Sequence, residues 1–181
     1  MNKFLSIITL NVNGLNAPIK RHRIAEWIRK HDPHICCLQE THLRKKDLHR
    51  LKVKGWKQIS QANGQEKKAN THIRQKPTSK NGHKGQKRAI KRDPEGHFII
   101  LKGRIHQEDI NIVNIYAPNR GAPKYIKKIL EDFKKDIDSN TIIVGDFNTP
   151  LLKMDRSSKQ NINKDIVALN NALDEMDLTD I

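Results

Sequence analysis

Hydrophobic residues occur along this chain in two patterns, as short continuous runs and as positions spaced three or four residues apart. The continuous runs are rich in β-branched residues, which predicts strands at 5–10, 34–39, 97–103, 110–117 and 141–145. The spaced positions predict amphipathic helices at 18–30 and 123–138, and a third helical stripe made of Ile166, Leu169, Leu173 and Met176. Strands interleaved with helices indicate an α/β (α+β) layered domain.

Prolines and gap lengths add detail to this pattern. Pro18 and Pro123 stand where the first turn of a helix tolerates proline, because the N–H groups of that turn have no partner within the helix. The gap between the strands at 97–103 and 110–117 is short enough for a hairpin. Part of the sheet is therefore expected to be antiparallel.

One stretch, from Ala69 to Arg88, fits neither pattern. It contains a single large aliphatic residue, no acidic residue and many Lys, Arg, Gly, Pro and Ser residues. Such a composition buries too little apolar surface to order the chain, so we expect a disordered basic loop at 69–88. This loop would be a nucleic-acid-binding arm or, in the interpretation we prefer, a solvated insertion without a specific task.

Length and charge set further bounds. With 181 residues, 35% of them hydrophobic, the chain is long enough for one domain with a sizeable core, so residues 1–181 are expected to form a single domain. Lys and Arg number 35 against 20 Asp and Glu, and the formal net charge of +15 predicts attraction to polyanions, nucleic acid before membrane. No apolar run approaches the roughly 20 residues that span a bilayer. We expect a soluble, intracellular monomer.

The two cysteines, Cys36 and Cys37, are neighbours inside an apolar run. Adjacent cysteines within a strand cannot build a disulfide framework, so reduced and packed thiols are expected. We assign them no chemical role.

Polar side chains follow several of the predicted strands, at the point where each strand ends. They are Asn11 and Asn13, Gln39 and Glu40, Tyr116 and Asn119, and Asp146 and Asn148. In a layered α/β domain such residues point into a shared crevice, where sites tend to be assembled. If the strand ends converge, the set is rich in hard oxygen ligands and poor in sulfur and imidazole, which favours Mg²⁺ or Mn²⁺ over zinc.

Several of these residues also have a simpler explanation. An asparagine after a strand, such as Asn11 or Asn13, is commonly a turn residue that hydrogen-bonds its own backbone. Tyr116 alone could be a core residue. Glu40 is harder to explain in this way, because a carboxylate at the end of a buried strand needs a partner. In "GDFN", residues 145–148, glycine permits close backbone approach and two polar residues flank one aromatic.

The motifs "TLNVNGLN", "CLQETH", "NIYAPN" and "GDFNTP", in this order and at this spacing, resemble those of the endonuclease/exonuclease/phosphatase superfamily. That superfamily includes exonuclease III, apurinic/apyrimidinic endonucleases and deoxyribonuclease I. The stretches "LNVNGLNAPIKRHRIAEWI", "IKRDPEGHFIILKG" and "NIYAPNRGAPKYIKKIL" are more closely similar to the endonuclease domain of mammalian long interspersed (LINE-type) retrotransposon polyproteins. The resemblance covers residues 4–68 and 89–181.

This resemblance implies a four-layered αββα sandwich and the Mg²⁺-dependent hydrolysis of a DNA phosphodiester, by a domain that is fused to a reverse transcriptase in its relatives. Glu40 would be the principal metal ligand, with Asn11 beside it. Asp146 would orient or deprotonate the attacking water and Asn148 would hold the scissile phosphate, and both are also candidate metal ligands. Tyr116 would donate to the phosphate or the leaving group. The residues expected to contact DNA are Asn13, Asn119 and Arg156. A DNA substrate would agree with a nuclear location.

Two features depart from the family pattern. The family's domain ends in a Ser-Asp-His motif, but all nine histidines lie at or before His106 and none follows an aspartate directly. We therefore expect reduced or no activity, since acid–base assistance contributes about 10² to 10⁴ in rate. The second departure is the segment 69–88, where relatives have an apolar central strand. Its hydrophilic sequence is expected not to form such a strand, which would leave apolar faces uncovered.

Three functional interpretations remain open. We favour a metal-dependent nuclease with weak or no turnover. The second interpretation is a non-catalytic module of retrotransposon origin that binds DNA or RNA through its positive charge. The third is a remnant without a selected function. Inositol and sphingolipid phosphatases share the core motifs, but the basic charge and the retrotransposon-like stretches favour DNA as the substrate.

Overall fold

The computed structural model describes residues 5–63, 70–75, 88–105, 108–151 and 163–180, and the chain divides into two compact units. The first comprises Met1–Tyr116 and Asn140–Asp146, and it contains every strand described here. The second comprises Ala117–Ser139 and Phe147–Ile181, and its described residues include two α-helices and no strand. We call them the two-sheet unit and the helical unit.

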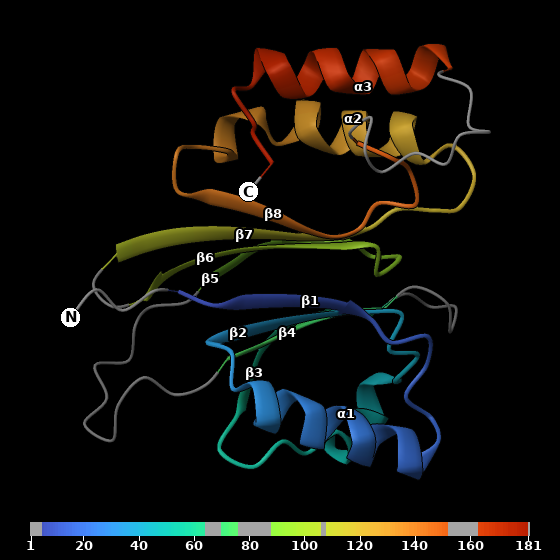
Figure 1. The fold of residues 1–181 in the computed structure, drawn as a ribbon, viewed down its shortest axis with the longest axis vertical. Helices are drawn as coiled ribbons and strands as arrows, with labels where there is room; N and C mark the ends of the chain where they lie inside the picture. Colours follow the sequence, from blue (N-terminus) through green and yellow to red (C-terminus); the bar gives the residue numbers. More distant parts are fainter. Residues whose placement is uncertain (1–4, 64–69, 76–87, 106–107, 152–162, 181) are drawn as a thin grey trace. The chain divides into compact units, whose positions relative to one another are not determined.

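The first sheet of the two-sheet unit has the strand order β1-β2-β4-β3 (Figure 1). Its strands are β1 (Ile7–Asn11), β2 (Ile35–Gln39), β3 (Lys57–Asn63) and β4 (Asn70–Gln75). β1 and β2 are parallel and are connected by helix α1 (Pro18–His31), whereas β4 is antiparallel to both β2 and β3. A short 3-10 helix, Lys45–Arg50, lies between β2 and β3 in the sequence.

The second sheet has the strand order β5-β6-β7-β8. Its strands are β5 (Arg88–Arg92), β6 (Phe98–Ile105), β7 (Glu108–Tyr116) and β8 (Thr141–Asp146). β6 and β7 form the antiparallel hairpin that the sequence predicts, and β7 and β8 are parallel. Because parallel neighbours end at the same edge of a sheet, β1 ends beside β2 and β7 ends beside β8.

The two-sheet unit has two hydrophobic clusters, one on each side of the first sheet. The inner cluster joins the two sheets and includes Ile35, Cys37, Ile73, Ile99, Leu101 and Ile112. The outer cluster joins the first sheet to α1 and includes Leu15, Ile28, Cys36, Leu38 and Leu51. This unit is therefore built of three layers, with α1 on one face of the first sheet and the second sheet on the other (Figure 1).

The adjacent cysteines show how β2 serves both clusters. Cys36 belongs to the outer cluster and Cys37 to the inner one, because successive side chains of a strand point to opposite faces. Both are buried and free, as predicted. Burial raises the pKa of the Cys36 thiol to about 12, so the thiol stays protonated and unreactive at neutral pH.

The helical unit contains α2 (Ala122–Asp132) and α3 (Lys164–Glu175), which contact each other. Pro123 lies in the first turn of α2, and the Asn163 side chain caps α3 by accepting from the Ile166 N–H at 2.9 Å. The helix predicted to reach residue 138 ends earlier. After Asp132 the chain tightens into a 3-10 helix, Lys134–Asp136, in which the Asp136 N–H donates to the Phe133 carbonyl.

The predicted α/β fold class is confirmed, together with all five predicted strands and all three predicted helices. β3, β4 and β5 were not predicted, because their sequences are mainly polar and lack the β-branched runs of the other strands. Over the described part of the chain, no helix combines the length and the apolarity that crossing a bilayer requires.

The prediction of a loop at 69–88 is wrong for β4, which lies inside the first sheet between β2 and β3. Four of its residues, Thr71, His72, Ile73 and Arg74, are buried although only one of them is apolar. The prediction was based on the small number of apolar residues in this segment. The segment is instead ordered by backbone pairing on both sides and by polar contacts of its side chains. Residues 76–87 of the predicted loop lie outside the described residues.

Some buried polar atoms of the β4 side chains have a hydrogen-bond partner and others have none. His72 Nε2 lies 3.0 Å from Thr41 Oγ1, and Arg74 Nη2 donates to the Leu51 carbonyl at 2.7 Å. Within the described part of the chain, His72 Nδ1 and Arg74 Nε and Nη1 are buried without a hydrogen-bond partner. Each such group typically costs about 1–3 kcal/mol. The middle of the first sheet is therefore folded at a penalty in stability.

His72 makes stability depend on pH. Burial first, and the nearby Arg74 charge second, lower the pKa of His72 from 6.5 to about 3. Between these values the unfolded chain binds a proton that the folded chain does not, so stability falls as the pH drops below about 6.5. We expect the free energy of unfolding to decrease by about 1.4 kcal/mol from this residue between about pH 7.5 and about pH 5.5.

Urea unfolding of the wild type and of His72→Leu at both pH values measures this contribution. The loss at low pH should be smaller in His72→Leu by that amount. An equal loss in both proteins would show that His72 is not the group responsible.

Candidate active site

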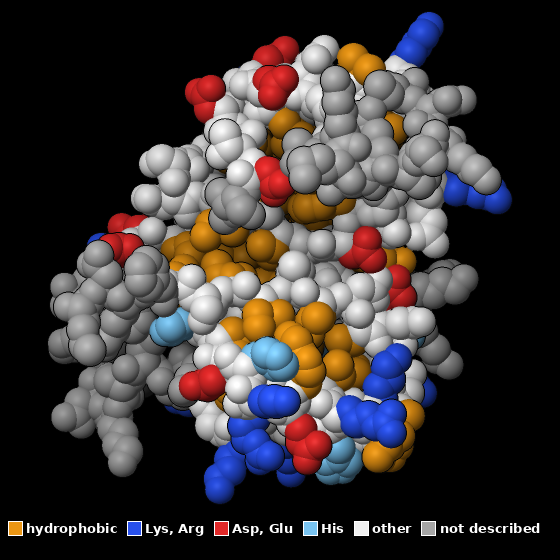
Figure 2. Space-filling view, viewed as in Figure 1, with side chains coloured by type: hydrophobic (Ala, Val, Ile, Leu, Met, Phe, Trp, Pro, Cys, Tyr) orange, Lys and Arg blue, Asp and Glu red, His pale blue; other side chains and the backbone are white. Residues whose placement is uncertain are grey.

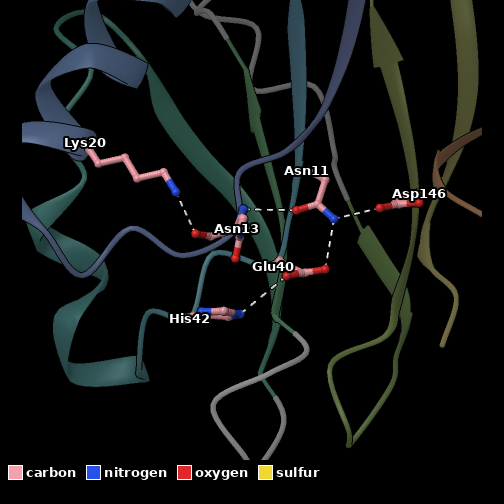
Figure 3. A network of polar contacts seen from close by, with 6 residues as sticks. All are labelled: Asn11, Asn13, Lys20, Glu40, His42 and Asp146. Carbon is pink, nitrogen blue, oxygen red and sulfur yellow. Dashed lines mark hydrogen bonds and ion pairs between the residues drawn. The ribbon is translucent and has the colours of Figure 1, made fainter. Parts of the chain in front are cut away.

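The ends of four strands come together in the two-sheet unit. Asn11 ends β1, Glu40 follows β2 directly, and Tyr116 and Asp146 end β7 and β8, where they are paired in register. The Asn11 amide connects the two sheets, because its Nδ2 donates to Glu40 Oε1 at 2.9 Å and to Asp146 Oδ2 at 2.6 Å (Figure 3). Two carboxylates from different sheets therefore converge on one side chain.

The orientation of the Asn11 amide is fixed by the turn that follows β1. Asn13 donates its backbone N–H to Asn11 Oδ1 at 3.0 Å, which leaves Nδ2 to face the carboxylates. Asn13 adopts a left-handed conformation (φ 41°), and Lys20 Nζ of α1 donates to its carbonyl at 2.6 Å. Asn11 is thus a turn residue, as its simpler explanation predicts. Its side chain also hydrogen-bonds both carboxylates.

Tyr116 lies beside the same carboxylates. Its side chain hydrogen-bonds Glu40, and its ring stacks on that of His97 with the centroids 6.0 Å apart. Partial burial, the hydrogen bond to Glu40 and the charges of Glu40 and Asp146 all raise the pKa of Tyr116 above its usual value. The phenol therefore keeps its proton at neutral pH and can act as a hydrogen-bond donor.

Gly145 explains why a β-branched run ends in "GDFN". It is paired with Ile115 in the register of β7 and β8 and has a φ of 145°. A Cβ at this position would lie 1.8 Å from the Ile115 carbonyl oxygen. Only glycine allows the two strands to approach this closely, and the next residue, Asp146, is then delivered opposite Tyr116.

Gln39, which sequence analysis grouped with the strand-end residues, has a different place. It is buried, and its Nε2 donates to Thr9 Oγ1 at 3.0 Å and to Asn114 Oδ1 at 2.5 Å. Asn114 lies in β7, so this bond ties the two sheets together close to Glu40 and Tyr116. Asn114 was missed, although an amide inside the apolar run "INIVNIY" is itself a signal, because a buried amide needs a partner.

His42 is another residue that sequence analysis missed. Its Nε2 lies 3.7 Å from Glu40 Oε2, the carboxylate oxygen that Asn11 does not contact. Figure 3 shows it on the opposite side of that carboxylate from Asn11. The signal was present in the motif "CLQETH", where the histidine stands two positions after the glutamate.

The remaining predicted residues belong to the helical unit or lie outside the described residues. Asn119 and Asn148 belong to the helical unit, where both are exposed. Asn148 adopts a left-handed conformation (φ 46°), and its Nδ2 donates to the Ala117 carbonyl at 2.7 Å. Arg156 lies outside the described residues.

The chemistry of the cluster fits a hard divalent cation. Glu40 and Asp146 supply carboxylate oxygens that already share one hydrogen-bond donor, so their negative charges face a common space. Asn11 presents its nitrogen to that space and would have to turn its amide to offer the oxygen. No cluster of three or more His, Cys, Asp or Glu residues suited to a metal occurs among the residues described. A small number of protein ligands is enough for Mg²⁺, because this ion usually keeps several of its waters.

Basic side chains gather on α1. Arg23, Arg29 and Lys30 are exposed there, with Glu26 as the one acidic residue of the helix. In Figure 2, Lys and Arg side chains cluster over the surface that α1 forms. This side of the two-sheet unit therefore presents a positive surface to polyanions.

Comparison with known proteins gives a family match and several structures of similar fold. The family model described as "Endonuclease/Exonuclease/phosphatase family" matches residues 8–177. Among solved structures, the chain is similar to the endonuclease domain of TRAS1, a telomere-specific non-LTR retrotransposon, with a TM-score of 0.68 and 13% identity over 95% of this chain and 72% of that one.

Two apurinic/apyrimidinic (AP) endonucleases are similar to the same extent. For the enzyme LMAP from Leishmania major the TM-score is 0.67 at 17% identity, over 95% of this chain and 65% of that one. For the enzyme from Archaeoglobus fulgidus it is 0.65 at 19% identity, over 96% of this chain and 71% of that one. These TM-scores show a shared fold. The match of the family model to residues 8–177 shows that the chain belongs to the endonuclease/exonuclease/phosphatase family.

Proposed function

We propose that this chain is the Mg²⁺-dependent, DNA-cleaving part of a retrotransposon-type endonuclease. The observation that carries the proposal is the convergence of Glu40 and Asp146 on the Asn11 amide, with a protonated Tyr116 beside them. Two carboxylates at one point can hold a divalent cation, and a phenol can donate to a phosphate oxygen. The similarity to a retrotransposon endonuclease domain and to two AP endonucleases supports DNA as the substrate.

In this proposal Glu40 and Asp146 hold Mg²⁺, with Mn²⁺ as an alternative. The bound cation would neutralise charge that develops on the phosphate oxygens during hydrolysis. Asp146 also accepts a hydrogen bond from the attacking water and orients it in line with the scissile bond. Tyr116 donates to the phosphate or to the leaving oxygen. Asn148 holds the phosphate, and Asn13, Asn119 and Arg156 contact the DNA strand.

We propose further that these 181 residues by themselves turn over slowly. They contain no Ser-Asp-His motif, and no histidine occurs after His106. They supply the carboxylate and phenol groups of the reaction but lack the Ser-Asp-His motif, which in the family assists proton transfer. A loss of about 10² to 10⁴ in rate is expected from the missing acid–base assistance.

Nicking of supercoiled plasmid by the purified chain tests this proposal. With Mg²⁺ we expect slow nicking that disappears in EDTA and in Asp146→Ala. Nicking that survives both treatments would come from a contaminating or unrelated activity and would contradict the proposal.

A second candidate function is non-catalytic binding of nucleic acid. It is favoured by the net charge of +15 and by the exposed basic residues of α1. Binding of this kind weakens steeply with salt, because neutralised phosphates release counterions. A folded chain that binds DNA in a salt-sensitive manner, but does not nick it with either Mg²⁺ or Mn²⁺, would favour this candidate.

A further inference from the structure

His42 lies between Glu40 and the turn that follows β1. Its Nε2 is 3.7 Å from Glu40 Oε2, and its side chain keeps 24% of its surface exposed. The two groups form an ion pair when the imidazole is protonated, and at 3.7 Å they are too far apart for a hydrogen bond. Asn11 donates to the other oxygen of the same carboxylate, so Glu40 has a nitrogen atom on either side (Figure 3).

The backbone holds His42 in this place. Glu40 and His42 both adopt left-handed conformations, with φ of 50° and 54°, which are unfavourable for residues with a side chain. Such conformations persist only where the surroundings impose them. Here the Gly14 N–H donates to the Glu40 carbonyl at 2.6 Å, and the Leu15 N–H donates to the Thr41 carbonyl at 2.8 Å.

Thr41 adds a second anchor between these two residues. It is fully buried, and its hydroxyl is hydrogen-bonded to the His72 ring in β4. Glu40 and Thr41 are therefore held by the segment that follows β1, and Thr41 is also held by β4 of the first sheet. The imidazole of His42 has little freedom to move away from Glu40.

Gly14 provides the space for the imidazole. A Cβ added to Gly14 would lie 2.9 Å from His42 Nδ1, closer than real Cβ atoms come to another heavy atom. The ring thus lies between Gly14, on the side of Nδ1, and the Glu40 carboxylate, on the side of Nε2. Glycine at position 14 permits a left-handed turn (φ 81°) and at the same time leaves room for His42.

We propose that His42 is a positioning residue, which holds the Glu40 carboxylate in the orientation that binds the divalent cation. This inference rests on the proposed function, since it requires that Glu40 is a metal ligand. A glutamate side chain has several rotatable bonds, and hydrogen bonds or charges on both oxygens restrict its rotation. Residues that orient a ligand in this way typically change metal affinity by about 10- to 100-fold when they are removed.

Binding of Mn²⁺ to the full chain, followed by the electron paramagnetic resonance signal of free Mn²⁺, tests this role without any measurement of activity. We expect His42→Ala to weaken Mn²⁺ binding by about 10-fold or more. His42→Gln keeps an N–H group at a similar distance from the backbone and should restore most of the affinity. Equal affinity in the wild type and His42→Ala would overturn the proposal, and so would a loss that His42→Gln does not reduce.

A pair of glycine variants provides an independent test with a matched control. Gly14→Ala forces a methyl group against His42, whereas Gly55→Ala has nearly the same backbone strain (φ 82°) with nothing within 4 Å. Gly14→Ala should weaken Mn²⁺ binding and Gly55→Ala should not. In a His42→Ala background, where the ring is absent, Gly14→Ala should have no further effect. Equal affinities of the two glycine variants would contradict the proposal, even if His42→Ala fails to fold.

Glu40→Gln separates this inference from the proposed function. If the wild type binds Mn²⁺, Glu40→Gln abolishes binding and the His42 variants do not change it, only the role of His42 is overturned. If the wild type does not bind Mn²⁺, or if Glu40→Gln binds it equally well, the proposed metal site is wrong and the role of His42 is overturned with it.

Discussion

Glu40→Gln is expected to lower the rate of Mg²⁺-dependent plasmid nicking by at least about 100-fold. The substitution keeps the size of the side chain and an oxygen that can accept from the Asn11 amide at Oε1. It removes the negative charge that would hold the cation. Because the substitution weakens binding of the cation, raising the Mg²⁺ concentration should recover part of the lost rate.

Glu26→Gln is the matched control for this experiment. Glu26 is exposed on α1, and the change removes the same charge and leaves the same size of side chain. It should leave the nicking rate unchanged within about twofold, since a single exposed charge contributes little. A rate for Glu40→Gln equal to that of Glu26→Gln would refute the assignment of Glu40 as a metal ligand.

Gly145→Ala is expected to destabilise the protein by at least about 3 kcal/mol. The new methyl carbon would lie 1.8 Å from the Ile115 carbonyl oxygen, and backbone atoms cannot move aside as a flexible side chain can. The strands β7 and β8 would have to separate at the end that delivers Tyr116 and Asp146. Thermal unfolding should show a decrease in Tm of about 6–12 °C.

Gly121→Ala serves as the control, because its φ is also positive (74°) but no atom lies within 4 Å of the new Cβ. It should cost about 1 kcal/mol from backbone strain alone. The difference between the two variants therefore reports the contact with Ile115 together with the greater backbone strain at a φ of 145°. If both variants unfold at the same temperature, the close approach of β7 and β8 is not a constraint on the fold.

Much of the fold could be predicted because its central elements follow simple patterns. The strands β1, β2, β6, β7 and β8 are apolar runs, and the helices carry apolar stripes. β4 could not be predicted in this way. Its interior position depends on pairing with β2, which is distant in sequence, as well as with β3, which directly precedes it. Its buried His72 and Arg74 are polar. Hydrophobic periodicity identifies elements by their apolar residues, whereas this strand is ordered by backbone pairing with its neighbours.

The candidate site was only partly predictable for a similar reason. The identities of Asn11, Glu40, Tyr116 and Asp146 could be read from the ends of predicted strands. Their convergence depends on the packing of two sheets, as the bonds from Asn11 to carboxylates 29 and 135 residues away show. His42 could not be identified from the strand pattern, since its contact with Glu40 arises from two left-handed residues in a loop.

The buried guanidinium of Arg74 reverses the usual relation between burial and mutational tolerance. Core positions are normally constrained and exposed positions are free to vary, because a core substitution leaves a cavity or an unpaired polar group. Position 74 already contains two unpaired polar atoms, Arg74 Nε and Nη1. They lie on the outer side of the first sheet, which faces Leu51 and α1. An apolar residue there would remove the two unpaired nitrogens at the cost of the hydrogen bond to the Leu51 carbonyl, so this buried position tolerates substitution better than an ordinary core position. Asn11 is exposed, yet its side chain contacts both carboxylates and the turn that follows β1. Substitution at this exposed position would therefore disturb the candidate active site.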